Sequence, residues 1–497
     1  MTYTSDALKK IRVTTEPHAD LQKARSPLAL WIEKVAYKHK QHLVWIHVTL
    51  FLFFMTLMII PLFTPNPVAS STLFNNLKLF STFLFWGLWF PLVFVSVIFA
   101  GRIWCGVLCP MGAASEWANK IGLKRKIPAW LRWEGTPILS FLLITILGQT
   151  LDVRDQTDAM LEIFGGTLIL AVLIGLLFGR QKRAWCRHAC PIGLLLGVFS
   201  RLSLVHLAPK MPQAGGDRYA ERGICPTMIE INHKAESRHC IECFRCVKPS
   251  SSGGLFVRFR SLGEEIVHIR DYHPSMAEIW FMFLATGVAL GGFLWLILPQ
   301  YQSFRTIVGT WFIEHGAYWI GNIGPHWLMS VHAGQGQAYN WLDFITIVGF
   351  MFFCMALSTL VLSAATALTA VLAGRYGAPY SFKQRYVELG YLFAPIAMIS
   401  IIIGLGDLLF GALASLHIPL WFLTGLKLGL FIASMLWSIQ LGYHILGRQQ
   451  LTPVGRWVAL MPSIVACLLI AAAWWPAIFG WHVSMLEMYR THLALFS

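Results

Sequence analysis

The most constraining feature of this sequence is a series of nine long apolar segments. A helix needs about 20 residues to cross the hydrocarbon core of a bilayer, and only the third segment, with 16 residues, is clearly shorter. Only 13% of the residues are charged, about half of the roughly 25% that is typical of soluble domains. This composition excludes a disordered chain, a nucleic-acid-binding domain and a soluble multi-domain enzyme. The sequence therefore predicts an all-α polytopic membrane protein with about nine transmembrane helices, at 43–63, 79–100, 136–151, 159–179, 277–298, 341–373, 387–410, 419–446 and 457–480.

The distribution of Lys and Arg predicts how these helices are oriented. If the N-terminus is cytoplasmic, 34 of the 39 Lys and Arg residues fall on the cytoplasmic side. Cytoplasmic loops are enriched in Lys and Arg, so we expect a multi-pass protein of the bacterial inner membrane with its N-terminus inside and its C-terminus in the periplasm. The net charge of +15 is then a topology signal, and we expect no nucleic-acid partner.

Eight of the ten cysteines gather on the predicted cytoplasmic side. The other two, Cys354 and Cys467, lie within predicted helices and are expected to be small buried hydrophobes. Thiols on the cytoplasmic side stay reduced, so closely spaced cysteines there indicate metal ligation rather than disulfides. The eight are Cys105, Cys109, Cys186, Cys190, Cys225, Cys240, Cys243 and Cys246.

Four of these cysteines belong to an internal repeat. The pattern W-C-x3-C-P-x-G occurs at residues 104–112 and again at 185–193, and each copy follows a predicted helix that ends in Gly-Arg. Two membrane crossings separate the copies, so both face the same side if the short third segment spans the membrane. The sequence therefore predicts two copies of a helical hairpin that ends in a cysteine pair.

A third cysteine motif lies at residues 240–246 and reads C-x2-C-x2-C. This is the start of the bacterial ferredoxin run, whose fourth cysteine follows three residues later and precedes a proline. The corresponding position here is Ser250, so the missing Cys-Pro ligand must come from elsewhere. The chain offers Cys109-Pro110, Cys190-Pro191 and Cys225-Pro226.

Eight cysteines make two sets of four, which predicts two [4Fe–4S] clusters. The preferred grouping places one cluster at the membrane edge and the second in a small cytoplasmic ferredoxin-like domain. An exchange of Cys-Pro ligands between the two clusters remains open. Structural zinc is the other alternative, but zinc ribbons use two C-x2-C pairs and do not need a triple run or three Cys-Pro steps. The two preferred sets are Cys105, Cys109, Cys186 and Cys190, and Cys225, Cys240, Cys243 and Cys246.

Over about residues 40–275 these motifs resemble the membrane-bound polyferredoxins of the NapH/NosR/CcoG type. The resemblance implies electron transfer in service of a periplasmic redox or metal-handling system, with the eight cysteines as cluster ligands. The chain departs from each relative: it lacks the flavin-attachment motif of the NosR type and has one truncated C-x2-C-x2-C run where the NapH type has two full runs. Five further spans replace the soluble β-domain of the CcoG type. This membrane extension is similar to the polyferredoxin subunit of FtrABCD-type ferrous-iron uptake systems.

These motifs divide the chain into four parts. We expect an N-terminal cytoplasmic segment (1–42), two transmembrane hairpins that each end in a C-x3-C-P motif (43–200), a cytoplasmic cluster domain (201–276), and a C-terminal transmembrane domain with an outer loop rich in His and Trp (277–497). Basic residues near the predicted clusters would favour an acidic donor and stabilise anionic clusters, although they also fit the topology rule. They are Arg102, Arg183, Arg187, Arg238, Arg245 and Lys248.

The C-terminal half offers weaker signals. His315, His326 and His332 lie in the predicted outer loop and could bind iron, copper or haem, or simply sit at the membrane interface. Asp407 and Lys427 lie within predicted helices, where ionisable residues are usually paired or functional, and we expect them to pair. Electrons bound for the outer face need a carrier across about 30 Å of hydrocarbon, such as a quinone or haem b.

The sequence therefore predicts an electron carrier or oxidoreductase subunit rather than a stand-alone enzyme. It would pass electrons between a cytoplasmic or quinone donor and a periplasmic or membrane partner with a redox or metal-handling role. Two alternatives remain. One is an electron-transfer accessory to ferrous-iron or copper uptake, with the outer histidines holding the metal. The other is a transporter whose cysteine module binds zinc.

Overall fold

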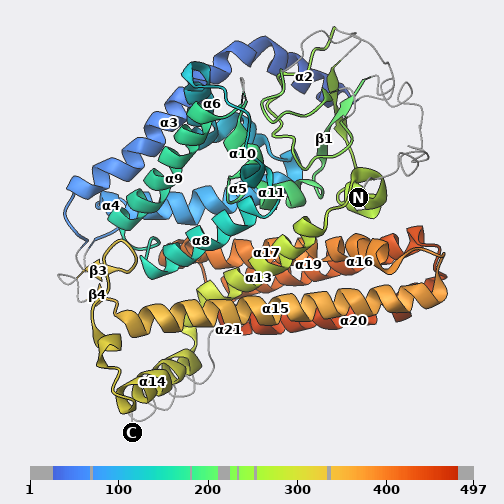
Figure 1. Ribbon diagram of the computed structural model, residues 1–497. Coiled ribbons are helices and arrows are strands. Elements are labelled where there is room, and N and C mark those ends of the chain that lie inside the picture. Colours follow the sequence, from blue (N-terminus) through green and yellow to red (C-terminus); the bar gives the residue numbers. More distant parts are fainter. Residues whose placement is uncertain are drawn as a thin grey trace.

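The computed structural model describes residues 26–67, 71–179, 182–210, 224–231, 234–250, 254–332 and 337–479. Within these residues the chain is mainly helical, and its helices form two groups that lie against each other (Figure 1). The N-terminal group, blue to green in the figure, carries the small cysteine-rich domain at one corner. The C-terminal group, yellow to red, is a bundle of long helices that run side by side.

Eight helical segments of the described chain are long and apolar enough to cross a membrane. Their presence confirms the prediction of an all-α polytopic membrane protein. The third predicted span forms only a 15-residue apolar helix, α8 (Thr136–Thr150). The eight segments are Pro27–Phe63, Leu77–Ala100, Thr157–Leu177, Met276–Ile297, Trp341–Tyr376, Phe382–Leu405, Leu420–Arg448 and Pro453–Ala473.

The N-terminal group packs around α9 (Thr157–Leu177), which contacts both α6 and α3. The second span is not a uniform α-helix, because a π-helical stretch, η4, separates α4 from α5. The remaining elements of this group are α3 (Leu43–Ile59), η3 (Ile60–Phe63), α4 (Leu77–Thr82), η4 (Phe83–Trp89), α5 (Phe90–Ala100), η5 (Trp104–Leu108), α6 (Pro110–Ile121), α7 (Ala129–Arg132), α10 (Ala184–His188) and α11 (Gly193–Ser200).

The C-terminal bundle is built on α13 and α15, which pack against each other along their lengths. Part of the segment expected to be a loop, residues 299–340, is helical and forms α14. The elements are α13 (Met276–Ile297), α14 (Pro299–Glu314), η8 (Tyr318–Gly321), the hairpin β3 (Val331–His332) and β4 (Gln337–Ala338), α15 (Trp341–Tyr376), α16 (Phe382–Gly390), η10 (Tyr391–Phe393), α17 (Ala394–Leu405), α18 (Asp407–Ser415), α19 (Leu420–Arg448), α20 (Pro453–Ala473) and α21 (Trp475–Phe479).

The small domain contains a two-stranded antiparallel sheet of β1 (Val205–Pro209) and β2 (Leu255–Phe259), followed by α12 (Glu264–Val267) and η7 (Ile269–Tyr272). Part of the predicted N-terminal segment (1–42) packs against this domain. Helix α2 (Pro27–His39) lies against β2, and the fully buried Glu33 accepts a hydrogen bond from the backbone N–H of Val257 at 2.9 Å. A short turn, η2 (Lys40–His42), then leads into α3.

A buried ion network joins the small domain to the bundle. The guanidinium of Arg201, which is fully buried, lies 2.8 Å from Glu265 of α12 and 3.0 Å from Glu278 of α13. A buried arginine is tolerated when carboxylates satisfy it in good geometry. These contacts fix the cysteine-rich end of the molecule against the C-terminal helices.

Candidate functional site

The first cysteine motif forms a turn followed by a helix start. Helix α5 ends at Gly101, whose φ of 59° is a left-handed conformation that glycine adopts most easily. Cys105 lies in η5, and Cys109 caps the N-terminus of α6, where its sulfur accepts a hydrogen bond from the Gly112 N–H at 3.4 Å. Pro110 takes the first helical position, where its missing N–H costs nothing. The motif thus holds two thiols at the end of a membrane helix.

The second motif repeats this construction after α9. Gly179 has a φ of 80°, Cys186 lies in the short helix α10, and Cys190 precedes the start of α11. Each motif has an arginine three residues before its first cysteine, Arg102 in the first copy and Arg183 in the second. In the Gly-Arg pairs that end the preceding helices, Arg102 corresponds instead to Arg180, which lies outside the described residues.

The two motifs pack directly against each other. A Cβ atom on Gly112 of the first motif would lie 3.1 Å from Arg183 Nη1 and 3.2 Å from the sulfur of Cys186 in the second. A Cβ atom on Gly193 would lie 2.9 Å from the carbonyl oxygen of Cys186 and 3.1 Å from Cys190 Cβ, both in its own motif. The space for a side chain is therefore restricted by the other motif at Gly112 and by the motif's own atoms at Gly193.

This packing places four cysteines around one cavity of about 230 Å³, namely Cys105, Cys109, Cys186 and Cys190. Burial, followed by the charges of neighbouring thiols, raises the pKa of Cys109 to about 11. Burial also raises the pKa of Cys186 to about 12, although Arg183 opposes the shift. Thiols must lose their protons to bind a metal, so occupation of this site would release protons.

The other four predicted ligands surround a second cavity and are Cys225, Cys240, Cys243 and Cys246. The C-x2-C-x2-C run is held in a tight loop, in which Glu242 and Phe244 have φ values of 41° and 57°. Cys225 enters from a separate segment. Each of the two cavities is thus lined by one of the two cysteine sets preferred from the sequence, and which cysteines share a cluster stays a prediction.

The two cysteine sites adjoin at Gly106. A Cβ atom on Gly106 would lie 2.1 Å from the carbonyl oxygen of Ile241 and 2.8 Å from the backbone N of Cys243, so only glycine fits between Cys105 and the second site. The carboxylate of Glu242 accepts a hydrogen bond from the Arg102 N–H at 2.6 Å. Burial raises the pKa of Glu242 to about 7, opposed by Lys234 and Arg102.

Buried positive charge surrounds the first site. Arg102 is 2% exposed and Arg183 is fully buried. In the described part of the chain, Arg102 Nε and Arg183 Nη2 have no hydrogen-bond partner. Buried N–H groups without partners are costly, and an anionic iron–sulfur cluster held by the four neighbouring cysteines fits this environment. Three of the six basic residues expected to dock a donor, Arg102, Arg183 and Arg238, are buried and thus cannot form a docking surface.

The first cavity also extends away from the cysteines between the membrane helices. Its walls are mainly aromatic and apolar. It reaches Gln149, at the C-terminal end of α8, and Arg154, which follows that helix. Sequence reasoning missed this cavity, although the aromatic run at residues 83–90 could have indicated it. The aromatic residues that line it are Phe54, Phe85, Trp86, Trp89, Phe90, Phe94, Trp104, Phe141, Phe164, Trp185 and Phe293.

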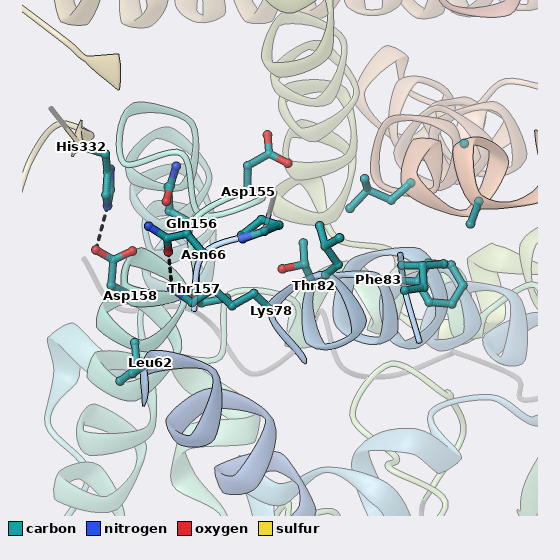
Figure 2. Close-up of a pocket in the computed structure, with 16 residues that line it drawn as sticks. Leu62, Asn66, Lys78, Thr82, Phe83, Asp155, Gln156, Thr157, Asp158 and His332 are labelled. Carbon is teal, nitrogen blue, oxygen red and sulfur yellow. Dashed lines mark hydrogen bonds and ion pairs between the residues drawn. The ribbon is translucent and has the colours of Figure 1, made fainter. Parts of the chain in front are cut away.

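A pocket of about 570 Å³, with both polar and apolar walls, lies at the other end of the same helices (Figure 2). His332 lies 2.8 Å from Asp158 at the start of α9, and Lys78 at the start of α4 donates to Asn66 at 2.6 Å. Both helical runs end at the first cysteine site, so this pocket and the cysteines lie at opposite ends of two membrane spans.

The structure does not bring the three predicted outer histidines into one site. His315 stacks on Trp311 with ring centroids 4.3 Å apart, whereas His332 faces Asp158. Among the described residues, no three His, Cys, Asp or Glu side chains are grouped so as to hold a single metal ion. Metal binding by His315, His326 and His332 stays a prediction.

Lys427 is half-buried in α19, where its ammonium lies 4.7 Å from the ring centroid of Phe410 and 3.4 Å from the carbonyl oxygen of Ala477. The side chain of its expected partner, Asp407, lies outside the described residues. The pairing of these two charges stays a prediction.

Comparison with known proteins supports the cluster chemistry of the first site. Residues 82–128 and 162–210 match the 4Fe-4S binding domain, and these segments contain both W-C-x3-C-P-x-G motifs. No solved structure matches the chain at a significant level.

Several curated proteins are similar to parts of the chain. An uncharacterized protein of Methanocaldococcus jannaschii is 27% identical over 32% of this chain and 66% of its own length. The ferredoxin-type protein NapH of Haemophilus influenzae is 27% identical over 38% of this chain and 70% of its own, and the protein NirI of Paracoccus denitrificans is 27% identical over 33% and 26%. The chain thus spans from about a quarter to 70% of these relatives. By its 4Fe-4S binding domain and these similarities, the chain is similar to membrane-associated, ferredoxin-type electron-transport proteins.

Proposed function

We propose that this membrane iron–sulfur protein binds two [4Fe–4S] clusters and passes electrons between a donor on the cytoplasmic side, or a membrane quinone, and a redox partner at the periplasmic face. The first cluster would be held by Cys105, Cys109, Cys186 and Cys190. The second would be held by Cys225, Cys240, Cys243 and Cys246. Such clusters supply one-electron transfer over a wide range of potentials.

One observation carries this proposal. Each of two cavities is lined by four of the eight cysteines, and the cavities adjoin where Gly106 meets the backbone of Cys243. Two cluster sites in backbone contact suit electron exchange between them. A module that binds one structural zinc ion would need only one set of four cysteines.

Charge and helix length support an orientation of the protein in the membrane. Most Lys and Arg residues share the side of the cysteines, which supports a cytoplasmic location in a bacterial inner membrane. Helix α9 has 21 residues, or about 30 Å at 1.5 Å per residue. The pocket of Figure 2, which contains His332, would therefore open at the periplasmic face, where a partner would dock.

The extended apolar cavity supports a quinone as the membrane donor. Ligand pockets for small aromatic molecules are mostly apolar with a few polar groups that fix orientation. Here aromatic walls lead from the first cysteine set to Gln149 and Arg154. A quinone ring in this cavity would be in contact with the first cluster site and within the bilayer.

The deciding measurement is the iron and acid-labile sulfide content of the chain, purified anaerobically in detergent. Two [4Fe–4S] clusters correspond to about eight iron and eight sulfide per chain. Zinc in place of iron, with sulfide near zero, would contradict the proposal and favour a transporter with a zinc-stabilised cysteine module.

A second function, as an electron-transfer accessory to ferrous-iron or copper uptake, is favoured by the pocket of Figure 2. It contains the His332–Asp158 ion pair, which offers two side chains that could ligate a metal (Figure 2). The test is equilibrium binding of Fe²⁺ and Cu⁺ to the intact protein and to its His332→Ala variant, with His273→Ala, an exposed histidine outside the pocket, as the control. Binding that is lost only in His332→Ala would support this role, and equal binding by all three would contradict it.

A further inference from the structure

Arg102 is unusual among the buried arginines near the two sites. Its Nη1 donates to the carbonyl oxygen of Arg238 at 2.7 Å, and its Nη2 lies 4.0 Å from the sulfur of Cys105. Its Nε has no partner, and within the described residues no carboxylate forms an ion pair with its guanidinium. Glu242 lies close, but its hydrogen bond is to the backbone N–H of Arg102 rather than to the side chain.

A buried guanidinium in this position requires a negative charge. Burying an ion without a partner is strongly destabilising, because the ion loses its hydration and gains nothing in return. Arg102 lines the same cavity as the four cysteines of the first set, and its Nη2 lies 4.0 Å from the sulfur of Cys105. The side chain of Arg102 therefore faces the ligands of that site.

Arg183 provides the contrast. It occupies the equivalent position in the second motif, but its Nε forms an ion pair with Glu116 at 2.7 Å. Glu116 also accepts two hydrogen bonds from Arg245, at 2.6 and 2.9 Å. Arg183 is thus ion-paired with a carboxylate, whereas within the described residues no carboxylate lies at ion-pair distance from the Arg102 guanidinium.

We propose that Arg102 is the counter-ion of the cluster at Cys105, Cys109, Cys186 and Cys190, and that its charge sets the midpoint potential of that cluster. The inference rests on the proposed function, because it requires a cluster at these cysteines. Hydrogen bonds and charges next to the sulfur ligands are among the factors that tune cluster potentials. A fixed positive charge favours the reduced, more negative state and so raises the potential.

The test is a redox titration followed by electron paramagnetic resonance on the intact protein and its Arg102→Gln, Arg102→Lys and Arg183→Gln variants. The Cys243→Ala variant identifies the signal of the first cluster, because it removes only the second. We expect Arg102→Gln to lower the midpoint potential of the first cluster alone. Arg102→Lys, which keeps the charge, should stay close to the wild-type value, and Arg183→Gln should shift the potential less than Arg102→Gln.

A matched control is Arg270→Gln, which removes a guanidinium held by Glu388 away from both sites. An unchanged potential in Arg102→Gln at full iron content, or an equal shift in both clusters, would overturn the proposal. If Arg102→Gln fails to retain its iron, retention by Arg102→Lys would support a requirement for the charge. Loss of the cluster from both Arg102 variants would overturn that requirement. A wild-type protein without iron would instead contradict the proposed function itself.

Discussion

The Nη1 of Arg183 donates a hydrogen bond to the carbonyl oxygen of Cys105 at 2.8 Å. This bond joins the second copy of the repeated motif to the first, across 78 residues of sequence. The reciprocal approach of Arg102 to Gly193 makes the relationship approximately symmetric. The repeat therefore does not build two separate sites: its two copies face each other and build one, while the second site is completed by Cys225 and the C-x2-C-x2-C run.

The grouping of the eight cysteines into two sites predicts the effect of removing one ligand of the second site. Cys243→Ala should reduce the iron content from about eight to about four per chain and abolish one of two cluster signals. The first site should survive because all four of its thiols come from the other set. Cys467→Ala, which truncates a buried cysteine of α20 in the C-terminal bundle, is the control and should keep all its iron. Loss of both signals in Cys243→Ala, or of neither, would contradict the grouping.

The junction between the sites predicts a strict requirement for glycine at position 106. In Gly106→Ala the new methyl group would lie 2.1 Å from the Ile241 carbonyl oxygen, so backbone must move. Overpacking of this kind costs about 1–3 kcal/mol, and we expect a lower melting temperature and reduced iron content. The control is Gly166→Ala in α9, where nothing lies within 4 Å of the added methyl group. Equal stability of the two variants would show that the contact at Gly106 is not required.

Much of this architecture was predictable from the sequence because its signals are local. Long apolar runs predict spans, and short cysteine spacings predict which thiols share a turn. The grouping into two sets was preferred on the same basis, but an exchange of ligands remained open because it depends on how distant segments pack.

The features that escaped prediction all arise from contacts between distant segments. Glu33 is a charged residue in the N-terminal segment, and nothing near it in sequence indicates that it bonds to Val257 of β2. The equivalence of Arg102 and Arg183 was obscured by the Gly-Arg pairs that end the preceding helices. The apolar cavity is lined by six membrane helices that are distant in sequence, so only the aromatic run at residues 83–90 gives a local signal for it.

The Glu116 network predicts a pH-dependent contribution to stability. Burial alone would raise the pKa of Glu116, but Arg183 and Arg245 outweigh it and lower the pKa from 4.5 to about 2. A pKa that is lower in the folded state stabilises the protein above pH 4.5, and this stabilisation is lost as the pH falls towards 2. Its full size is about 3 kcal/mol, at 1.36 kcal/mol per pKa unit.

The comparison is between the wild-type protein and Glu116→Gln, by thermal unfolding in detergent at pH 7 and pH 3. Glu116→Gln should be less stable at pH 7, and the difference should be smaller at pH 3. Both chains carry the same eight cysteines, so acid loss of bound iron affects both. A difference that stays constant or grows as the pH falls would contradict the assignment of Glu116 as an ionised partner of two arginines.

The extended cavity predicts a substitution that separates quinone access from cluster binding. Thr145 of α8 lines the cavity but belongs to neither cysteine motif, so Thr145→Phe would occupy part of the cavity and leave all cysteine ligands in place. We expect full iron content but slower reduction of the clusters by a quinol, because the added ring takes up volume that a quinone would need. Leu143→Phe is the matched control, since Leu143 lies on the same helix but is 52% exposed and faces away from the protein interior. Reduction by dithionite should be unaffected in both variants. If Thr145→Phe and Leu143→Phe accept electrons from quinol at the wild-type rate, the cavity is not the route by which a quinone reaches the first cluster.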